Sequence, residues 1–211
     1  MLILGAKGFA KEVLEICHNN DELSNLAFFD NVNAEINGLL YNKFQIIKTL
    51  EHAKFFFQKI DGRFTIGIGN PRVRENLAKQ FIKLGGKLHS TISSKADIGS
   101  YGIDIGDGAN ILDGVKISND VKIGLAPIIY YNSIITHDVK IGDFVEISPD
   151  VKILGRATVG NFCQLGAGTI ILPDIKIGNN VTTGAGAVVT KDLPDNCTAV
   201  GVPSKIIKHS K

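Results

Sequence analysis

The sequence has few groups that could form covalent cross-links or metal sites. It contains three cysteines, whose odd number and wide spacing fit neither a disulfide framework nor a cysteine metal motif. This predicts a reducing, cytoplasmic location. Of the five histidines, only His137 falls inside the periodic part of the chain described below. A zinc enzyme of that architecture needs three histidine ligands, so we expect no metal cofactor.

Strong net charge and long apolar runs are also lacking. The 211 residues carry a net charge of +2, which gives no reason to expect nucleic acid or an anionic membrane as a partner. The first apolar block, Met1 to Leu4, is too short for a signal peptide, and no stretch is long enough to span a bilayer. These absences favour a globular protein that acts on soluble small molecules.

What the sequence does contain is a period of six residues between Ile105 and Val189. Of the fifteen positions at this spacing, fourteen are Ile, Leu or Val, and Thr183 is the exception. Neither a helix nor a simple strand has this period, which is typical of a hexapeptide β-helix. Glycine recurs one residue after the aliphatic position, and we attribute it to corners whose backbone conformation a Cβ would penalise. The step from Ile98 to Ile105 is seven, which predicts one extra residue near 101–102.

Residues 1–86 predict a small α/β domain. Strands that alternate with helices indicate a parallel sheet, and the segment is too short for a complete two-halved dinucleotide fold. We therefore expect one mononucleotide-binding unit, followed at 87–211 by a β-helix domain with a C-terminal tail. The expected strands are 1–4, 26–30 and 64–68, and the expected helices are 11–18, 46–57 and 72–84.

A glycine-rich turn follows the first expected strand. A turn of this kind exposes backbone N–H groups at a positive helix end, which suits a phosphate. The spacing Gly5, Gly8, Ala10 matches the dinucleotide fingerprint only in part, because Lys7 stands where the second glycine would be. Asp30 ends the second strand, where an acid could bind a ribose or a base. A tight turn with an ordinary helix start is the alternative interpretation.

The lone histidine of the repeat is followed by an acid. Asp138 could raise the basicity of His137 and hold its orientation. If three hexapeptides make one coil, residues 18 apart stack, and Gly155 then lies one layer from His137. A glycine there leaves room for a ligand and exposes an N–H, so base and oxyanion donor would be neighbours. A solvated His–Asp pair near a corner is the alternative.

Four segments together resemble the PglD/NeuD family, which are bacterial sugar acyltransferases with a left-handed β-helix. The segments are Gly5-Ala6-Lys7-Gly8-Phe9-Ala10, Ile66-Gly67-Ile68-Gly69-Asn70, Thr136-His137-Asp138 with Ile141-Gly142-Asp143-Phe144, and Gly201-Val202-Pro203-Ser204-Lys205. The resemblance extends over essentially the whole chain.

The resemblance implies a homotrimer that binds acetyl-CoA in the groove between neighbouring prisms. It implies His137 as general base, Asp138 as its acidic partner and Gly155 as the donor to the thioester oxygen. Further coenzyme contacts would come from Ala167, Ala185 and Lys205. The nucleotide-sugar site would contain Gly5, Lys7, Gly8, Asp30 and Asn70.

Three functions remain open at this point. The first is acetyl transfer from acetyl-CoA to the amine of a dTDP- or UDP-linked 4-amino-4,6-dideoxyhexose, for a bacterial surface glycan such as the O-antigen of lipopolysaccharide. The second is O-acetylation of a sialic acid or a free sugar, for which the same coil and base would serve. The third is a non-catalytic scaffold with a nucleotide-sugar sensor, because solenoids offer flat surfaces for assembly.

Overall fold

A computed structural model describes residues 1–209 and divides into two compact units, Met1–Ser94 and a second that begins at Lys95. The boundary predicted between residues 86 and 87 lies slightly earlier. The difference arises from β6 (Lys87–Leu88) and β7 (Thr91–Ile92), which belong to the first unit. There β6 pairs with β5 (Arg63–Ile66), and the carboxamide of Asn20 donates to the carbonyl of Ile92 over 2.8 Å.

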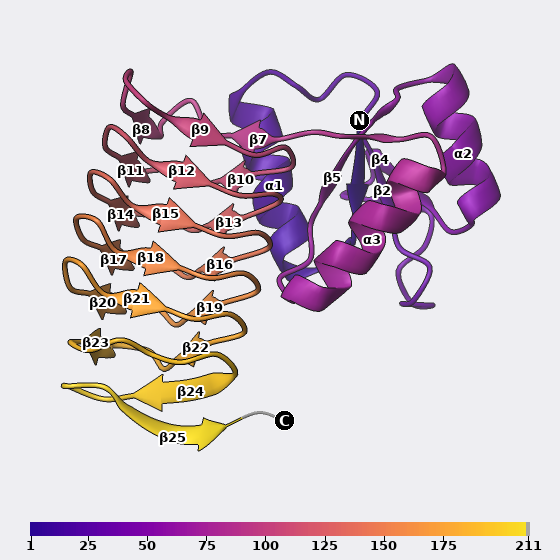
Figure 1. Cartoon of the computed structure of the whole chain (residues 1–211). Coiled ribbons are helices and arrows are strands. Elements are labelled where there is room, and N and C mark those ends of the chain that lie inside the picture. The colour runs from indigo at the N-terminus through magenta and orange to yellow at the C-terminus, as the bar shows by residue number, and fades with distance from the viewer. Residues whose placement is uncertain (210–211) are drawn as a thin grey trace. The chain divides into compact units, whose positions relative to one another are not determined.

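The first unit is built on one sheet with the order β3-β4-β2-β1-β5-β6 (Figure 1). Its central strand β1 runs parallel to β2 on one side and to β5 on the other, and only β3 is antiparallel to its neighbour. The remaining elements are β1 (Leu2–Leu4), α1 (Gly8–Asn19), β2 (Ala27–Phe29), β3 (Leu39–Leu40), β4 (Phe44–Ile47), α2 (Leu50–Lys59) and α3 (Pro71–Lys83).

Aromatic and aliphatic side chains form the core of this unit. Every residue of β1 is buried, as expected for a central parallel strand that is covered on both faces. Phe81 of α3 packs against Phe29, Phe57 and Phe64, with ring centroids 4.9 to 6.1 Å apart. The edge contacts with Phe29 and Phe57 stabilise the core beyond the area that they bury.

One predicted element was wrong. The segment 46–57 was expected to be a single helix, but it contains the end of β4 and most of α2. Ile46 and Ile47 pair with Phe28 and Phe29 of β2, so β-sheet pairing prevails over helical spacing. The helix starts only after Thr49, whose hydroxyl accepts from the N–H of His52 as an N-cap.

The second unit is a parallel β-helix whose coils stack along one axis (Figure 1). Each coil contributes one two-residue strand to each of three sheets. The first sheet has eight strands and contains β7, β10 (Asn110–Ile111), β13 (Ile128–Ile129), β16 (Glu146–Ile147), β19 (Gln164–Leu165), β22 (Thr182–Thr183), β24 (Cys197–Val200) and the antiparallel β25 (Lys205–His209). The second contains β8 (Asp97–Ile98), β11 (Lys116–Ile117), β14 (Ile134–Ile135), β17 (Lys152–Ile153), β20 (Ile170–Ile171) and β23 (Val188–Val189). The third contains β9 (Asp104–Ile105), β12 (Lys122–Ile123), β15 (Lys140–Ile141), β18 (Thr158–Val159) and β21 (Lys176–Ile177).

Strand register confirms the six-residue period. Ile123 pairs with Ile141, which is 18 residues later, so three hexapeptides make one coil. In the first coil Ile98 pairs with Ile117, which is 19 residues later, and the predicted extra residue is therefore present. Thr183, the one polar residue of the aliphatic stack, is buried, and its hydroxyl lies 2.8 Å from that of Thr169.

The recurring glycines have a different cause from the one predicted. The left-handed backbone conformation occurs three residues after the aliphatic position, for example at Asp138 with φ 62°. Gly124 and Gly142 lie one residue after it, outside the positive-φ set, and they are confined by the next coil. A Cβ at Gly142 would lie 2.3 Å from the side-chain oxygen of Asn161, so close stacking of coils rather than conformation requires glycine there.

The cysteines lie in the interior. Cys17, Cys163 and Cys197 are all free and buried. Burial raises the pKa of the thiols of Cys17 and Cys163 to about 12. Across residues 1–209, no helix combines the length and the apolar character that a bilayer crossing requires.

Candidate functional site

Two neighbouring cavities open at the carboxyl ends of β1, β2 and β5. The chain turns to opposite sides of β1 here, which makes this edge the topological switch point where ligands of open α/β sheets bind. The cavities have volumes of about 300 and 270 Å³, and both are lined by Gly5, Asp30, Asn33 and Ile68. The larger is walled by apolar side chains, and the smaller lies along the glycine turn with Lys7 and Gly8.

The glycine turn has the shape that an anion site needs. Gly5 adopts φ 102°, and a Cβ on it would lie 3.0 Å from the carbonyl oxygen of Gly67. A Cβ on Gly8 would meet nothing within 4 Å, so the space above the start of α1 is open. No side chain caps the N-terminus of α1 and no acid lies in its first turn, so this positive helix end suits an anion.

Asp30 holds the following loop rather than projecting into the cavity as a free carboxylate. Its side chain is only 5% exposed. It accepts hydrogen bonds from the N–H groups of Val32 and Asn33 and from the carboxamide of Asn33, over 2.8 to 3.1 Å. Burial raises the pKa of Asp30, but the hydrogen bonds from Asn33 and Val32 outweigh burial and leave the pKa below its ordinary value.

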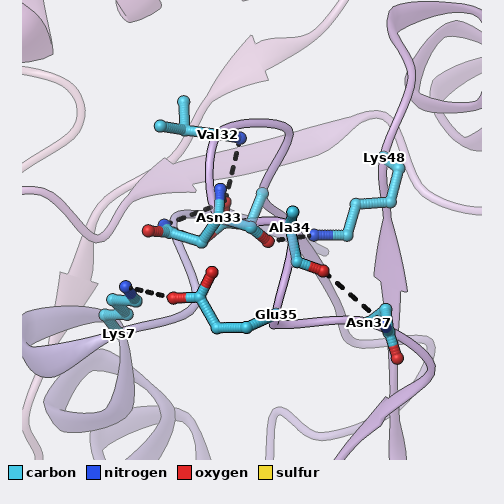
Figure 2. Close-up of polar contacts among 8 residues, drawn as sticks. Lys7, Val32, Asn33, Ala34, Glu35, Asn37 and Lys48 are labelled. Carbon is cyan, nitrogen blue, oxygen red and sulfur yellow. Dashed lines mark hydrogen bonds and ion pairs between the residues drawn. The ribbon is translucent and has the colours of Figure 1, made fainter.

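Two lysines extend this network over residues 31–37 (Figure 2). Lys48 donates to the carbonyl of Asn33 over 2.8 Å, and Lys7 of the glycine turn pairs with Glu35 over 2.7 Å. Both Lys7 and Glu35 are more than half exposed, so the pair is accessible to a ligand. Sequence reasoning found Asp30 and Lys7 but missed this loop. One sequence feature could have predicted that this loop belongs to the site: it is a polar segment that directly follows a strand at the switch point.

Asn70 begins a helix. Its side-chain oxygen accepts from the N–H groups of Arg72 and Val73, each over 3.1 Å, so Asn70 is the N-cap of α3 and Pro71 is the first helical residue. Asn70 lines neither cavity, although Gly69 and Val73 beside it do. Its assignment as a substrate contact stays a prediction.

The second candidate site lies in the β-helix, at the corner between β14 and β15. The Nδ1 of His137 lies 2.7 Å from Oδ2 of Asp138, and each side chain is about half exposed (55% and 54%). An ionised carboxylate can only accept, so Nδ1 carries the proton and Nε2 has a free lone pair. The imidazole is thus oriented as a base by its neighbour.

Gly155 lies directly above this imidazole. A Cβ at Gly155 would lie 2.7 Å from Cε1 and 2.8 Å from Nε2 of His137, so any other residue there would displace the imidazole. The carbonyl of His137 accepts from Arg156 N–H over 3.1 Å, which fixes the two corners in register. In the part of the chain that the structure describes, no hydrogen bond engages the Gly155 N–H. The expected stacking of base and glycine is therefore present.

The third sheet carries an open groove of about 400 Å³ beside this corner. Lys122 and Lys140 project from its strands, and Asp120, Asp138 and Arg156 project from stacked corners. Arg156 forms a two-pronged ion pair with Asp174, with distances of 2.6 and 2.8 Å. The 18-residue stacking rule alone would have placed Arg156 and Asp174 above Asp138.

The predicted coenzyme residues lie at other places on the prism. Ala167 and Ala185 are exposed at the corner between the first and second sheets, where the carbonyl of Ala167 accepts from Gly186 N–H over 2.8 Å. Gly155 lies at the corner between the second and third sheets, so one whole face separates it from Ala167. Lys205 begins β25 and is exposed. One chain alone does not bring these residues together.

Potential metal ligands are not gathered at either place. In the described range 1–209, no three side chains of His, Cys, Asp or Glu lie close enough to hold an ion.

Comparison with known proteins covers both units. Residues 1–81 match the model of the PglD N-terminal domain, and residues 156–191 match that of the bacterial transferase hexapeptide repeats. A search of curated proteins gives no significant match. Among solved structures, WeeI from Acinetobacter baumannii AYE is 30% identical with a TM-score of 0.87, and the alignment covers 98% of each chain. The chain belongs to the PglD/NeuD family of sugar acyltransferases.

Two other solved structures support the same family and have ligands. PerB from Caulobacter crescentus, solved with CoA and GDP-perosamine, is 29% identical with a TM-score of 0.88, over 98% of this chain and 96% of that one. The acetyltransferase domain of PglB from Neisseria gonorrhoeae FA1090, solved with acetyl coenzyme A, is 26% identical with a TM-score of 0.87, over 98% of both chains. These matches confirm the predicted fold class, an α/β unit followed by a left-handed β-helix.

Proposed function

We propose that the protein transfers an acetyl group from acetyl-CoA to the amino group of a nucleotide-linked 4-amino-4,6-dideoxyhexose. The observation that carries this proposal is the contact between the imidazole of His137 and the backbone of Gly155. It is supported by the likeness to PerB, a structure with CoA and GDP-perosamine, and to PglB, a structure with acetyl coenzyme A. The nucleotide is dTDP, UDP or GDP, and the product serves a bacterial surface glycan such as an O-antigen.

The corner formed by His137 and Gly155 supplies both the base and the oxyanion donor for the reaction. The amine nitrogen of the sugar attacks the thioester carbonyl carbon while Nε2 of His137 accepts a proton from that nitrogen. Negative charge grows on the carbonyl oxygen, where the free N–H of Gly155 stabilises it. The intermediate then collapses: the C–S bond breaks, the amide remains, and the CoA sulfur leaves with the proton held by His137. Asp138 stabilises the imidazolium in between.

The glycine-rich crevice of the first unit binds the nucleotide diphosphate. The pyrophosphate lies over Gly8 and the uncapped start of α1, near Lys7. The apolar cavity beside Gly5 accepts the base or the ribose, with Asp30 and Asn33 at its polar side. In this arrangement the first unit binds the sugar nucleotide and the β-helix carries out the chemistry.

A homotrimer completes the coenzyme site. The second sheet lies between the corner of Gly155 and the corner of Ala167, and it presents the half-buried Ile134, Ile170 and Val188 outward. If three prisms turn this face toward a common axis, the Gly155 corner of one copy lies beside the Ala167 corner of the next. Acetyl-CoA then binds between copies, with Ala185 and Lys205 also contributed by the neighbour.

An acceptor panel tests the proposal. The purified protein is incubated with acetyl-CoA and with amino sugars linked to UDP, dTDP, GDP or CMP, and with sialic acid and free sugars, and products are detected by mass. We expect an added acetyl group only on nucleotide-linked amino sugars. Acetylation of hydroxyl groups in sialic acid or a free sugar would instead support an O-acetyltransferase. Absence of CoA binding by calorimetry would support a non-catalytic scaffold.

The cellular location stays a prediction as well. Free thiols at Cys17, Cys163 and Cys197 are typical of a reducing compartment, and acetyl-CoA would be used there.

A further inference from the structure

A column of charged side chains, three acids and one arginine, runs past the candidate base. Asp120, Asp138, Arg156 and Asp174 occupy the same corner in successive coils, each with a φ between 57° and 64°. Successive coils lie about 4.8 Å apart, the spacing of neighbouring strands. Arg156 therefore has one carboxylate a coil below it and another a coil above it, and its long side chain can reach only one of them in a two-pronged pair.

In the structure Arg156 pairs with Asp174, the carboxylate of the following coil. Its Nε and Nη2 lie 2.6 and 2.8 Å from the two oxygens of Asp174, a geometry that uses both carboxylate oxygens. Asp138, the carboxylate of the preceding coil, is hydrogen-bonded to Nδ1 of His137 over 2.7 Å. The pKa of the Arg156 guanidinium is raised mainly by Asp174 and in smaller part by the charge of Asp138, so both acids act on the same cation.

We propose that Asp174 is a positioning residue: it holds Arg156 away from Asp138, so that the Asp138 carboxylate stays with the imidazole of His137. This inference rests on the proposed role of His137 as the base. Without Asp174, the guanidinium would turn to Asp138, the nearest remaining carboxylate in the column. Asp138 would then orient and support the imidazole less well.

The other charged groups near His137 are less suited than Arg156 to compete with the imidazole for Asp138. The coil below contributes Asp120 and Lys122, the same coil contributes Lys140, and the coil above contributes Arg156. The two lysines belong to the strands of the third sheet, whereas Arg156 stands in the same corner column as Asp138. The guanidinium is also the cation suited to a two-pronged contact with a carboxylate.

The test compares Asp174→Ala with the double variant Arg156→Met/Asp174→Ala, using Arg156→Met as the reference. We expect Asp174→Ala to lower kcat/KM about fivefold, the effect of one exposed ion pair. The acidic limb of its pH–rate profile should move to lower pH, because the imidazolium loses carboxylate support. The double variant should recover the profile of Arg156→Met, since no guanidinium is left to capture Asp138.

Two results would overturn the proposal: a double variant as impaired as Asp174→Ala, or an acidic limb that does not move. Asp174→Asn replaces Asp174→Ala if the latter fails to fold. Asp97→Ala, which removes another exposed pair of the prism at Lys116, is the control and should leave the pH profile in place.

An NMR titration separates this inference from the proposed function. The His137 ring signals, assigned with His137→Asn, are followed against pH in each variant. If wild-type protein transfers no acetyl group, the proposed function fails, but the ring titration still decides the inference. A shift of the His137 midpoint to lower pH in Asp174→Ala, reversed in the double variant, supports it, and an unchanged midpoint contradicts it.

Discussion

The two candidate sites are built in different ways. At the β-helix corner, His137 and Gly155 meet because their positions differ by 18 residues and every coil repeats the same path. In the crevice of the first unit, Gly5, Asp30 and Gly67 meet because three strands from distant parts of the chain end at one edge. The first site is set by a local period, and the second by non-local pairing and loop contacts. Substitutions should therefore act differently at the two sites.

The largest expected effect is the loss of the base. His137→Ala removes the only oriented imidazole at the corner, and general-base catalysis contributes roughly 10² to 10⁴ in rate. We expect kcat to fall by at least about 10², with thermal stability unchanged because the side chain is half exposed. Steady-state kinetics with the best acceptor of the panel, together with a thermal melt, checks this. Turnover within about threefold of wild type would remove His137 from the mechanism.

The next effect tests the glycine amide. In Gly155→Ala the new methyl group would lie within 2.8 Å of the His137 ring, so imidazole and backbone must move apart. We expect kcat to fall by about 10² to 10³, the usual cost of a misplaced oxyanion donor.

A matched control exists for this substitution. Gly178→Ala is more crowded, with its methyl 2.3 Å from Oδ1 and 2.6 Å from the backbone nitrogen of Asp195, but it lies at a corner without a histidine. Gly178→Ala should lower stability and leave kcat per folded molecule unchanged. If both variants lost turnover to the same degree, crowding of the coils rather than the position of the amide would explain the loss.

The same contrast decides how much the sequence could predict. The coil length, the extra residue before Ile105 and the stacking of Gly155 on His137 all follow from counting, because each coil repeats the same geometry. The role of Asp30 as the anchor of its loop could not be predicted by counting residues. Its partners Val32 and Asn33 are in an irregular loop, and no period relates a loop residue to its contact. The strand β4 was missed for a related reason, since its pairing with β2 is non-local.

A smaller effect is expected in the crevice. Asp30→Ala leaves the N–H groups of Val32 and Asn33 without their acceptor, and the loop that lines both cavities loses its anchor. We expect KM for the sugar nucleotide to rise about tenfold, and kcat to change less than twofold because the corner is untouched. Calorimetric titration with the nucleoside diphosphate and steady-state kinetics measure the two effects. A fall in kcat at unchanged KM would place Asp30 in the chemistry instead.

The smallest effect concerns stability alone. Asp61 of the first unit accepts from the N–H, Nε and Nη2 of Arg63 over 2.8 to 3.1 Å, and its side chain is 11% exposed. Burial raises the pKa of Asp61, but the hydrogen bonds from Arg63 and from the Met1 amine outweigh burial and hold the pKa far below its ordinary value. The folded state therefore binds its proton less readily than the unfolded state, so the stabilisation is complete above the unfolded pKa of about 3.9 and is lost as the pH falls below it.

Asp61→Asn should therefore lower the free energy of unfolding at pH 7 by about 1.5–3 kcal/mol, the range for a hydrogen bond to a charged group. The difference from wild type should shrink as the pH falls below about 4, because the unfolded wild-type chain then takes up a proton at Asp61 that the folded state does not bind. Denaturant unfolding across this range measures the difference. Asp97→Asn, an exposed acid of the β-helix, should show neither the loss nor its pH dependence. A constant difference between Asp61→Asn and wild type at all pH values would mean that packing, rather than the charge of Asp61, stabilises this strand end.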